Sequence, residues 1–258
     1  MLLAFDIGNT NVAVGLFRGR KLVKSWKFKT DSDKTSDEYG AVLLDLMRVA
    51  GLAAGKVTGA IISSVVPPLT PVIEEVCRAY FATPASVVGP GLKTGMPILY
   101  ENPLEVGADR ITASVAAFEK YGGPVIVLDF GTATTFDAVS AKGEYLGGAI
   151  APGIRISAEA LYLKTARLPR IEIRKPKRAI GRTTVSSMQS GLYFGYIGLV
   201  TKTIEEIRKE LGKNARVIAT GGFGGQIASE LPEIEAYEPD LVLEGLRIIH
   251  ERNRDDRG

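Results

Sequence analysis

The sequence predicts an α/β fold built from two related halves. Two apolar segments, Leu2–Phe17 (LLAFDIGNTNVAVGLF) and Val125–Ser140 (VIVLDFGTATTFDAVS), follow one pattern. Each reads as a strand, an acidic residue, a glycine turn with small polar side chains, and a second strand. Helical patterns follow in both halves, so each half should be a sheet packed against helices.

The first half reads as a three-strand meander followed by helices and strands. Thr35 and Glu38 stand three positions apart before AVLLDLMRVAG, a capping-box pattern that opens a helix, and Gly51 would end that helix. The expected elements are strands at 2–6, 11–17, 22–29, 60–65 and 85–88, a helix ending at 51, and helices at 70–81 and 105–121.

The second half repeats this order after the break at Tyr121-Gly122-Gly123-Pro124. We therefore expect two domains, 1–120 and 121–258. The elements expected in the second are strands at 125–129, 134–140, 143–149 and 216–219, a long helix at about 186–211, and a last helix at 240–253.

The long helix contains three glycines, Gly191, Gly195 and Gly198, which weaken helicity and favour close packing against another helix. That contact could lie within the chain or between subunits. Met188, Leu192, Gly195 and Leu199 recur at helical spacing, and this face is predicted to be buried between two subunits.

Composition excludes several classes of protein. The chain has 258 residues, 45% of them hydrophobic, and a net charge of +3. No apolar run reaches membrane-spanning length, and no basic region precedes the first strand, so neither a membrane span nor a signal peptide is expected. Cys77 and His250 are the only residues of their types, which excludes an intrachain disulfide, a thiolate metal site and a histidine triad. We expect a cytoplasmic protein.

One segment is strongly basic. Lys164–Arg182 holds eight Lys or Arg residues and one Glu. It lacks the interleaved aromatic residues of an RNA-binding surface, so we expect no nucleic acid. The segment is predicted to be a solvated connection, and one or two of its cations could border an anionic ligand.

The two glycine turns have the composition of phosphate-binding turns. A glycine without Cβ lets backbone N–H groups approach an anion closely, and Thr and Asn add donors. Asp6 and Asp129 would repel phosphate unless a cation lay between, which suggests Mg²⁺ near both. The alternative is two ordinary β-hairpins; the repetition favours the phosphate turns.

Three further motifs could carry chemistry. In Gly107-Ala108-Asp109-Arg110, at a helix start, Asp109 is either a helix-end charge or a general base, and Arg110 could anchor an anion. Thr183-Thr184 either caps the long helix or binds a ligand. The glycines of residues 220–225 match neither a Rossmann fingerprint nor a P-loop, so any ATP site belongs to another fold.

Together these motifs make the sequence similar to the type III pantothenate kinases. The resemblance covers nearly the whole chain. One departure is Thr183, where the family favours Asn, and it leaves Thr184 in place. The matching motifs, in order, are DIGNTN at 6–11, ISSVVP at 62–67, EVGADR at 105–110, DFGTATTFD at 129–137, GGAIAPGI at 147–154, TVSSMQSG at 184–191 and ATGG at 219–222.

The resemblance implies an actin-like ATPase fold with two tandem ribonuclease-H-like domains and mixed sheets. It implies ATP-dependent phosphorylation of pantothenate to 4'-phosphopantothenate, the first step of coenzyme A biosynthesis, by a homodimer. The alternatives are another actin-like phosphotransferase or phosphatase, and an ATP-binding regulatory module. Turnover of ATP with a panel of acceptors separates these possibilities.

The resemblance also assigns residues. Asp109 would be the proton acceptor, Asp129 would hold a monovalent cation, K⁺ or NH₄⁺, and Asp6 would lie on the Mg²⁺ side, through water. The ATP-binding residues would be Asp6, Ile7, Gly8, Asn9, Thr10, Asn11, Val12, Ala13 and Thr132. The pantothenate-binding residues would be Tyr100, Gly107, Ala108, Asp109, Arg110 and Thr184.

Overall fold

The computed structural model describes residues 1–254, which form two units. The first consists of Met1–Lys120 together with the segment from Asp240 onward, and the second is Tyr121–Pro239. The sequence analysis placed that last segment in the second domain. The structure corrects this assignment, because the C-terminal helix packs on the first sheet.

The first sheet has the strand order β3-β2-β1-β4-β5. Its first three strands are antiparallel, and β4 and β5 run parallel to β1. Along β1, Leu3, Phe5 and Ile7 enter the core, so Asp6 belongs to the opposite face. The strands are β1 (Leu2–Ile7), β2 (Asn11–Arg18), β3 (Lys21–Lys29), β4 (Gly59–Ser64) and β5 (Ala85–Val87).

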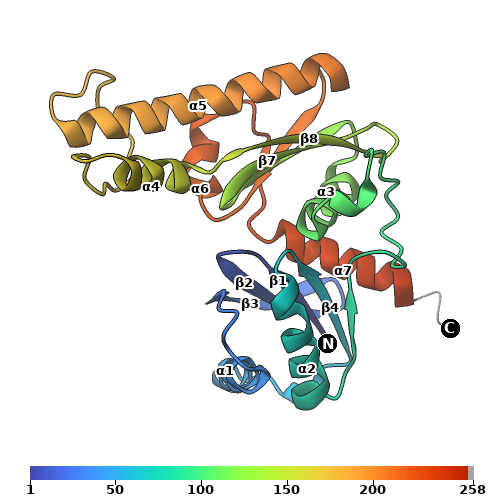
Figure 1. The fold of residues 1–258 in the computed structure, drawn as a ribbon. Coiled ribbons are helices and arrows are strands. Elements are labelled where there is room, and N and C mark those ends of the chain that lie inside the picture. The colour runs from blue at the N-terminus through green and yellow to red at the C-terminus, as the bar shows by residue number, and fades with distance from the viewer. Residues whose placement is uncertain (255–258) are drawn as a thin grey trace. The chain divides into compact units, whose positions relative to one another are not determined.

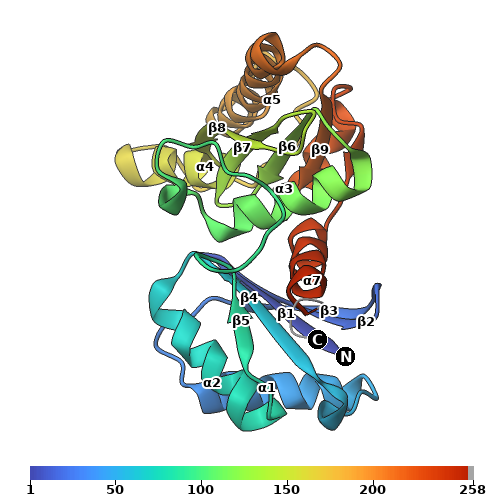
Figure 2. The same ribbon diagram turned by 90° about the vertical axis from the view of Figure 1, so that its right-hand side faces the viewer.

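Helices cover both faces of the first sheet (Figure 2). On one face lie α1 (Ser36–Val49) and α2 (Thr70–Phe81), and on the other lies α7 (Leu241–Arg254). The expected capping box at Thr35 and Glu38 is confirmed, with both hydrogen bonds present. Cys77 of α2 is fully buried in the core, as a small apolar residue would be.

Two glycines of the first sheet make room for α7. A Cβ on Gly15 would lie 3.1 Å from a methyl group of Leu243, and a Cβ on Gly59 would lie 2.9 Å from the His250 ring. A periodicity analysis of α7 alone reveals an apolar face but not which sheet that face meets. This is why the sequence assigned the helix to the wrong domain.

The remaining α-helix of the first unit, α3 (Ala108–Tyr121), begins later than predicted. A single 3₁₀ turn, Pro103–Glu105, precedes it. Seven consecutive residues of α3 are buried, from Ile111 to Ala117, and Gly245 of α7 lies directly against the Thr112 carbonyl. The motif Gly107–Arg110 therefore occupies the first turn of a firmly packed helix.

The second sheet repeats the first. Its order is β10-β9-β6-β7-β8, with β6, β7 and β8 antiparallel and β9 and β10 parallel to β6. Read from β8, this is the order and orientation of the first sheet, which confirms two related halves. The strands are β6 (Val125–Phe130), β7 (Ala133–Val139), β8 (Tyr145–Pro152), β9 (Arg216–Thr220) and β10 (Ala236–Tyr237). The sequence did not indicate the two-residue β10.

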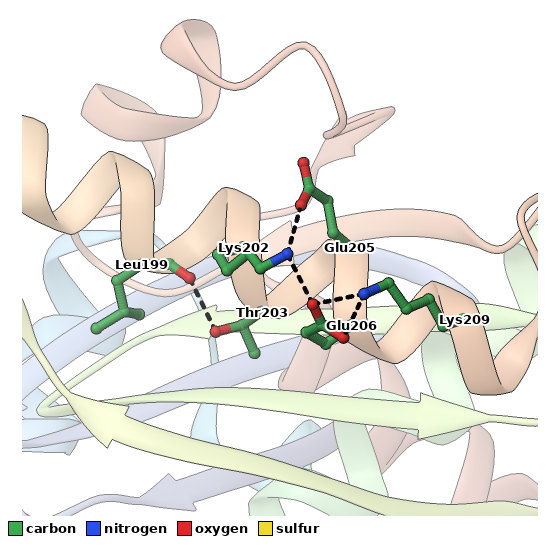
Figure 3. A network of polar contacts seen from close by, with 6 residues as sticks. All are labelled: Leu199, Lys202, Thr203, Glu205, Glu206 and Lys209. Atoms are coloured by element: carbon green, nitrogen blue, oxygen red, sulfur yellow. Dashed lines mark hydrogen bonds and ion pairs between the residues drawn. The ribbon is translucent and has the colours of Figure 1, made fainter.

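Three helices accompany the second sheet: α4 (Ile154–Lys164), α5 (Thr184–Leu211) and the short α6 (Gly224–Ile227). Figure 1 shows α5 running along the sheet beside α4. The α5 residues that enter the core are Tyr193, Tyr196, Val200 and Ile204. Near its C-terminal end, Lys202 and Lys209 form ion pairs along the helix with Glu205 and Glu206 (Figure 3).

The α5 residues predicted to form a subunit contact have different environments in the structure. Met188 is buried, and Leu199 packs against the core of its own unit. The three helix glycines are exposed, with open space where a Cβ would lie: Gly191, Gly195 and Gly198. A subunit contact that includes the three glycines therefore lies on a different face of α5 from the face that contains Leu199.

Among residues 1–254, the helices lack the combination of length and apolar composition that a membrane span requires.

Candidate functional site

The first glycine turn closes the hairpin between β1 and β2. The Gly8 N–H donates to the Asn11 carbonyl at 3.0 Å, and a Cβ on Gly8 would lie 3.2 Å from that carbonyl oxygen. The side chains of Asn9, Thr10 and Asn11 are exposed. The turn therefore presents polar groups to solvent from a rigid hairpin, as a phosphate turn requires.

Two predicted ATP-binding residues beside this turn belong to the core. Ile7 and Val12 are fully buried and pack among the apolar residues beneath the sheet. Their side chains position the hairpin, so any contact they make with ATP uses the backbone.

Asp6 lies where β1 ends. Its register partner on β4 is Ser63, so the two side chains belong to the same face of neighbouring strands. Among the described residues, the buried Ser63 hydroxyl has no hydrogen-bond partner. Mg²⁺ is commonly held by one or two carboxylates together with waters and substrate phosphates. The half-buried Asp6 carboxylate fits that role.

The start of α3 holds Asp109 in a defined geometry. The Arg110 N–H donates to Asp109 Oδ1 at 2.8 Å, and a Cβ on Gly107 would lie 2.5 Å from the same oxygen. Glycine is therefore needed at position 107 for the carboxylate to fold back over it. Burial raises the pKa of Asp109, and the hydrogen bond and charge of Arg110 offset part of that rise.

Val65 connects this helix start to the strand ends. Its N–H donates to the Ile7 carbonyl at 3.0 Å, and its methyl group lies 3.5 Å from where a Cβ on Gly107 would be. The first unit thus places the end of β1, the loop after β4 and the first turn of α3 side by side. Val65 thus contacts both the end of the strand that carries Asp6 and the helix start that carries Asp109.

The second glycine turn follows β6. The Gly153 N–H donates to the Thr132 carbonyl at 3.2 Å, and Gly153 lies so close to this turn that a Cβ would collide with the carbonyl. The side chain of Thr132 itself is exposed. Gly153 thus supports the turn through this hydrogen bond, and the Thr132 side chain remains accessible to a ligand.

Asp129 is enclosed by two glycine turns. A Cβ on Gly131 would lie 3.5 Å from its Oδ1, and a Cβ on Gly221, whose φ is +92°, would collide with that oxygen. Carboxylate and carbonyl oxygens are the ligands that hard cations prefer. The half-buried carboxylate in a backbone cradle fits a monovalent cation. Across residues 1–254, clusters of three or more His, Cys, Asp or Glu suited to a metal are absent.

The two remaining predicted residues lie in different units. Tyr100 is 36% exposed in the segment that leads to α3. Thr184 is the first residue of α5 and is exposed. The cap of that helix is Thr183, whose hydroxyl accepts the Ser186 N–H at 3.2 Å, so the expected cap is present and Thr184 follows it.

The sequence analysis missed two residues beside these turns. Ser63 is the strand partner of Asp6, and Thr30 donates a hydrogen bond to the Gly8 carbonyl. Neither belongs to the glycine turns. The strand pairing of the hairpin with β3 and β4 is the signal that brings them to the site.

Comparison with known proteins gives a consistent result. Residues 2–206 match the family model described as type III pantothenate kinase. The chain is 54% identical to a type III pantothenate kinase of Geobacter sulfurreducens over 99% of its own length and all of the relative. It is 52% identical to one of Syntrophotalea carbinolica over 98% of its own length and all of the relative.

Solved structures agree on the fold. A protein of Campylobacter jejuni assigned to the Baf family of transcriptional activators has a TM-score of 0.62 at 20% identity, with 98% of this chain and 99% of that chain covered. The ethanolamine utilization protein EutJ of Carboxydothermus hydrogenoformans has a TM-score of 0.55 at 13% identity, with 96% and 89% covered. At such identities the likeness shows the fold alone, and that fold is the actin-like one, as predicted.

Proposed function

The chain belongs to the type III pantothenate kinase family, and we propose that its two glycine turns and the Asp109 helix start together phosphorylate pantothenate with ATP. The product is 4'-phosphopantothenate, and the reaction is the first step of coenzyme A biosynthesis. Kinases of this kind use ATP and a divalent metal. The observation that carries the proposal is the Asp109 carboxylate, held over Gly107 with a raised pKa, at a helix start that Val65 connects to the strand end bearing Asp6.

The residues proposed to bind the ATP phosphates lie on the two glycine turns. In the first unit these are Asp6–Ala13, with the backbone of the exposed turn and the side chains of Asn9, Thr10 and Asn11 as the donors. Ile7 and Val12 contribute through the backbone, since their side chains are buried. In the second unit the contributing residue is Thr132.

The residues proposed for pantothenate are Tyr100, Gly107–Arg110 and Thr184. Arg110 supplies a positive charge for the substrate carboxylate. Asp109 accepts the proton of the primary hydroxyl as that oxygen forms its bond to the γ-phosphorus and the bond to the ADP oxygen breaks. A raised pKa makes the ionised Asp109 carboxylate a stronger base.

Two cations belong to the proposal. Asp6 would hold Mg²⁺, through water, and Asp129 would hold K⁺ or NH₄⁺ in the cradle of Gly131 and Gly221. When bound, the cations neutralise phosphate charge, which lets carboxylates coexist with ATP. We also propose a homodimer and a cytoplasmic location, where ATP is available.

The test is purified protein with ATP and Mg²⁺, offered pantothenate or a panel of sugars and polyols, with mass detection of phosphorylated products. We expect phosphopantothenate and no phosphorylated sugar. Phosphorylation of a sugar in preference to pantothenate would identify another actin-like phosphotransferase. ATP binding with no acceptor-dependent turnover would indicate a regulatory module.

A further inference from the structure

Thr30 holds the first phosphate turn by two carbonyl groups. It follows β3 directly, and its hydroxyl donates to the Gly8 carbonyl at 2.6 Å. Its backbone N–H donates to the Thr10 carbonyl at 3.0 Å. Thr30 therefore engages the carbonyl oxygens of the two residues that flank Asn9 in the turn.

These bonds determine which polar groups the turn presents to a ligand. In a planar trans peptide the C=O and N–H groups point in opposite directions. The Gly8 carbonyl points to Thr30, so the Asn9 N–H of the same peptide points away from it. A phosphate needs N–H groups facing it and carbonyl oxygens turned away, because the oxygens would repel its charge.

The backbone beside Thr30 is held in place by contacts with the core of the first unit. The next residue, Asp31, exchanges two hydrogen bonds with Tyr39 of α1: its N–H donates to the phenol oxygen at 3.1 Å, and the phenol donates to its carbonyl at 3.0 Å. Tyr39 is 5% exposed and packs edge-on against Phe28 of β3, with ring centroids 6.4 Å apart. The Thr30 hydroxyl is therefore delivered to the turn from a rigid support.

We propose that Thr30 is a positioning residue for the ATP phosphates, which acts by keeping the Gly8 carbonyl turned away from them. The proposal rests on the proposed kinase function and adds a residue to its phosphate site. A purely structural role for the same hydrogen bond predicts lower stability with no preference between the two substrates. A positioning role predicts a selective loss of nucleotide binding.

The experiment compares three variants of the full chain. Thr30→Val removes the hydroxyl and keeps the side-chain shape and the backbone N–H, while Thr30→Ser keeps the donor. Thr203→Val is the matched control. The Thr203 hydroxyl also donates to a backbone carbonyl, that of Leu199, at 2.8 Å, but within α5 (Figure 3). The readouts are KM for ATP and for pantothenate, kcat, the thermal midpoint, and the Kd of a non-hydrolysable ATP analogue with Mg²⁺.

We expect Thr30→Val to raise the analogue Kd and the KM for ATP about tenfold, the scale of one lost hydrogen bond. The KM for pantothenate should stay within about twofold, Thr30→Ser should restore nucleotide binding, and Thr203→Val should leave it unchanged. If Thr30→Val does not fold, Thr30→Ala supplies the same comparison.

Equal weakening of both substrates, or an unchanged analogue Kd, would overturn the inference. These outcomes are distinct from a failure of the proposed function. If the wild-type chain does not phosphorylate pantothenate but binds the analogue, and Thr30→Val weakens that binding selectively, the kinase assignment fails and the role of Thr30 stands.

Discussion

The hydroxyl oxygens of Thr134 and Tyr196 lie 2.5 Å apart in the buried contact between β7 and α5. Tyr196 is 6% exposed and Thr134 is fully buried. Burial raises the pKa of the Tyr196 phenol to about 12; the Thr134 hydrogen bond lowers it and the negative charge of Asp129 raises it further. The hydrogen bond therefore connects α5 to β7. The charge of Asp129, the proposed cation ligand, acts on the Tyr196 phenol at this contact.

Removing one member of this pair should cost stability. Tyr196→Phe leaves the Thr134 hydroxyl buried without its partner, at a cost of about 1–3 kcal/mol. In Thr134→Val combined with Tyr196→Phe both polar groups are gone, so the double variant should lose less than the sum of the two single changes. Urea unfolding of the four proteins measures the coupling. Additive losses would show that the two hydroxyl groups do not interact.

Local patterns in the sequence predicted most of the fold. The apolar runs identified β1 to β9 except for their ends, and the Thr35–Glu38 spacing identified the start of α1, because caps and alternation are local signals. The repeat beginning at Leu2 and Val125 predicted two sheets of one topology. The family resemblance supplied the proposed roles of Asp109 and Asp129, which spacing alone left open.

What the sequence could not predict depends on contacts between distant residues. The fit of α7 on the first sheet rests on Gly15 and Gly59, which read as ordinary strand residues. The outward orientation of Gly195 required knowing which face of α5 meets the sheet. Thr30 reaches the first glycine turn through strand pairing, which no local motif reveals.

The pH dependence of kcat/KM should reflect Asp109. Its folded pKa is raised above the ordinary value of 3.8, with burial as the main cause. As the pH falls through that raised pKa the carboxylate is protonated and cannot accept the proton, so kcat/KM should fall about tenfold per pH unit on an acid limb displaced upward. An acid limb at or below the ordinary Asp range would contradict the burial of this carboxylate in the free enzyme.

Activity should depend on a monovalent cation at Asp129. Replacing K⁺ by a large organic cation at constant ionic strength should reduce turnover strongly, because the carboxylate would then face the phosphates without compensation. Asp129→Asn removes that charge, so the response to K⁺ should be lost in this variant. Equal rates of the wild-type protein in the two buffers would show that turnover does not depend on a monovalent cation.

We expect the exposed glycines of α5 to lie in the subunit contact of the proposed dimer. A Cβ at Gly195 enters open space, so Gly195→Glu should leave the fold intact, as circular dichroism would show. A charged side chain on a helix face that packs closely against a partner should shift the mass measured by light scattering from dimer to monomer. Lys202→Glu, on the polar end of the same helix, is the control. An unchanged dimer mass for Gly195→Glu would place the contact elsewhere.

The most direct test of the account is the turnover of Asp109→Asn with pantothenate saturating. Asn keeps the size and can still accept the Arg110 N–H, but it cannot take up the substrate proton. We predict a loss of kcat of about 10² to 10⁴, the usual contribution of a general base, with binding of the ATP analogue near that of the wild type. Because an ionised carboxylate with a raised pKa costs stability at neutral pH, the variant should be at least as stable as the wild type. A variant that folds, binds nucleotide and retains most of its kcat would show that Asp109 is a helix-end charge and that the base lies elsewhere.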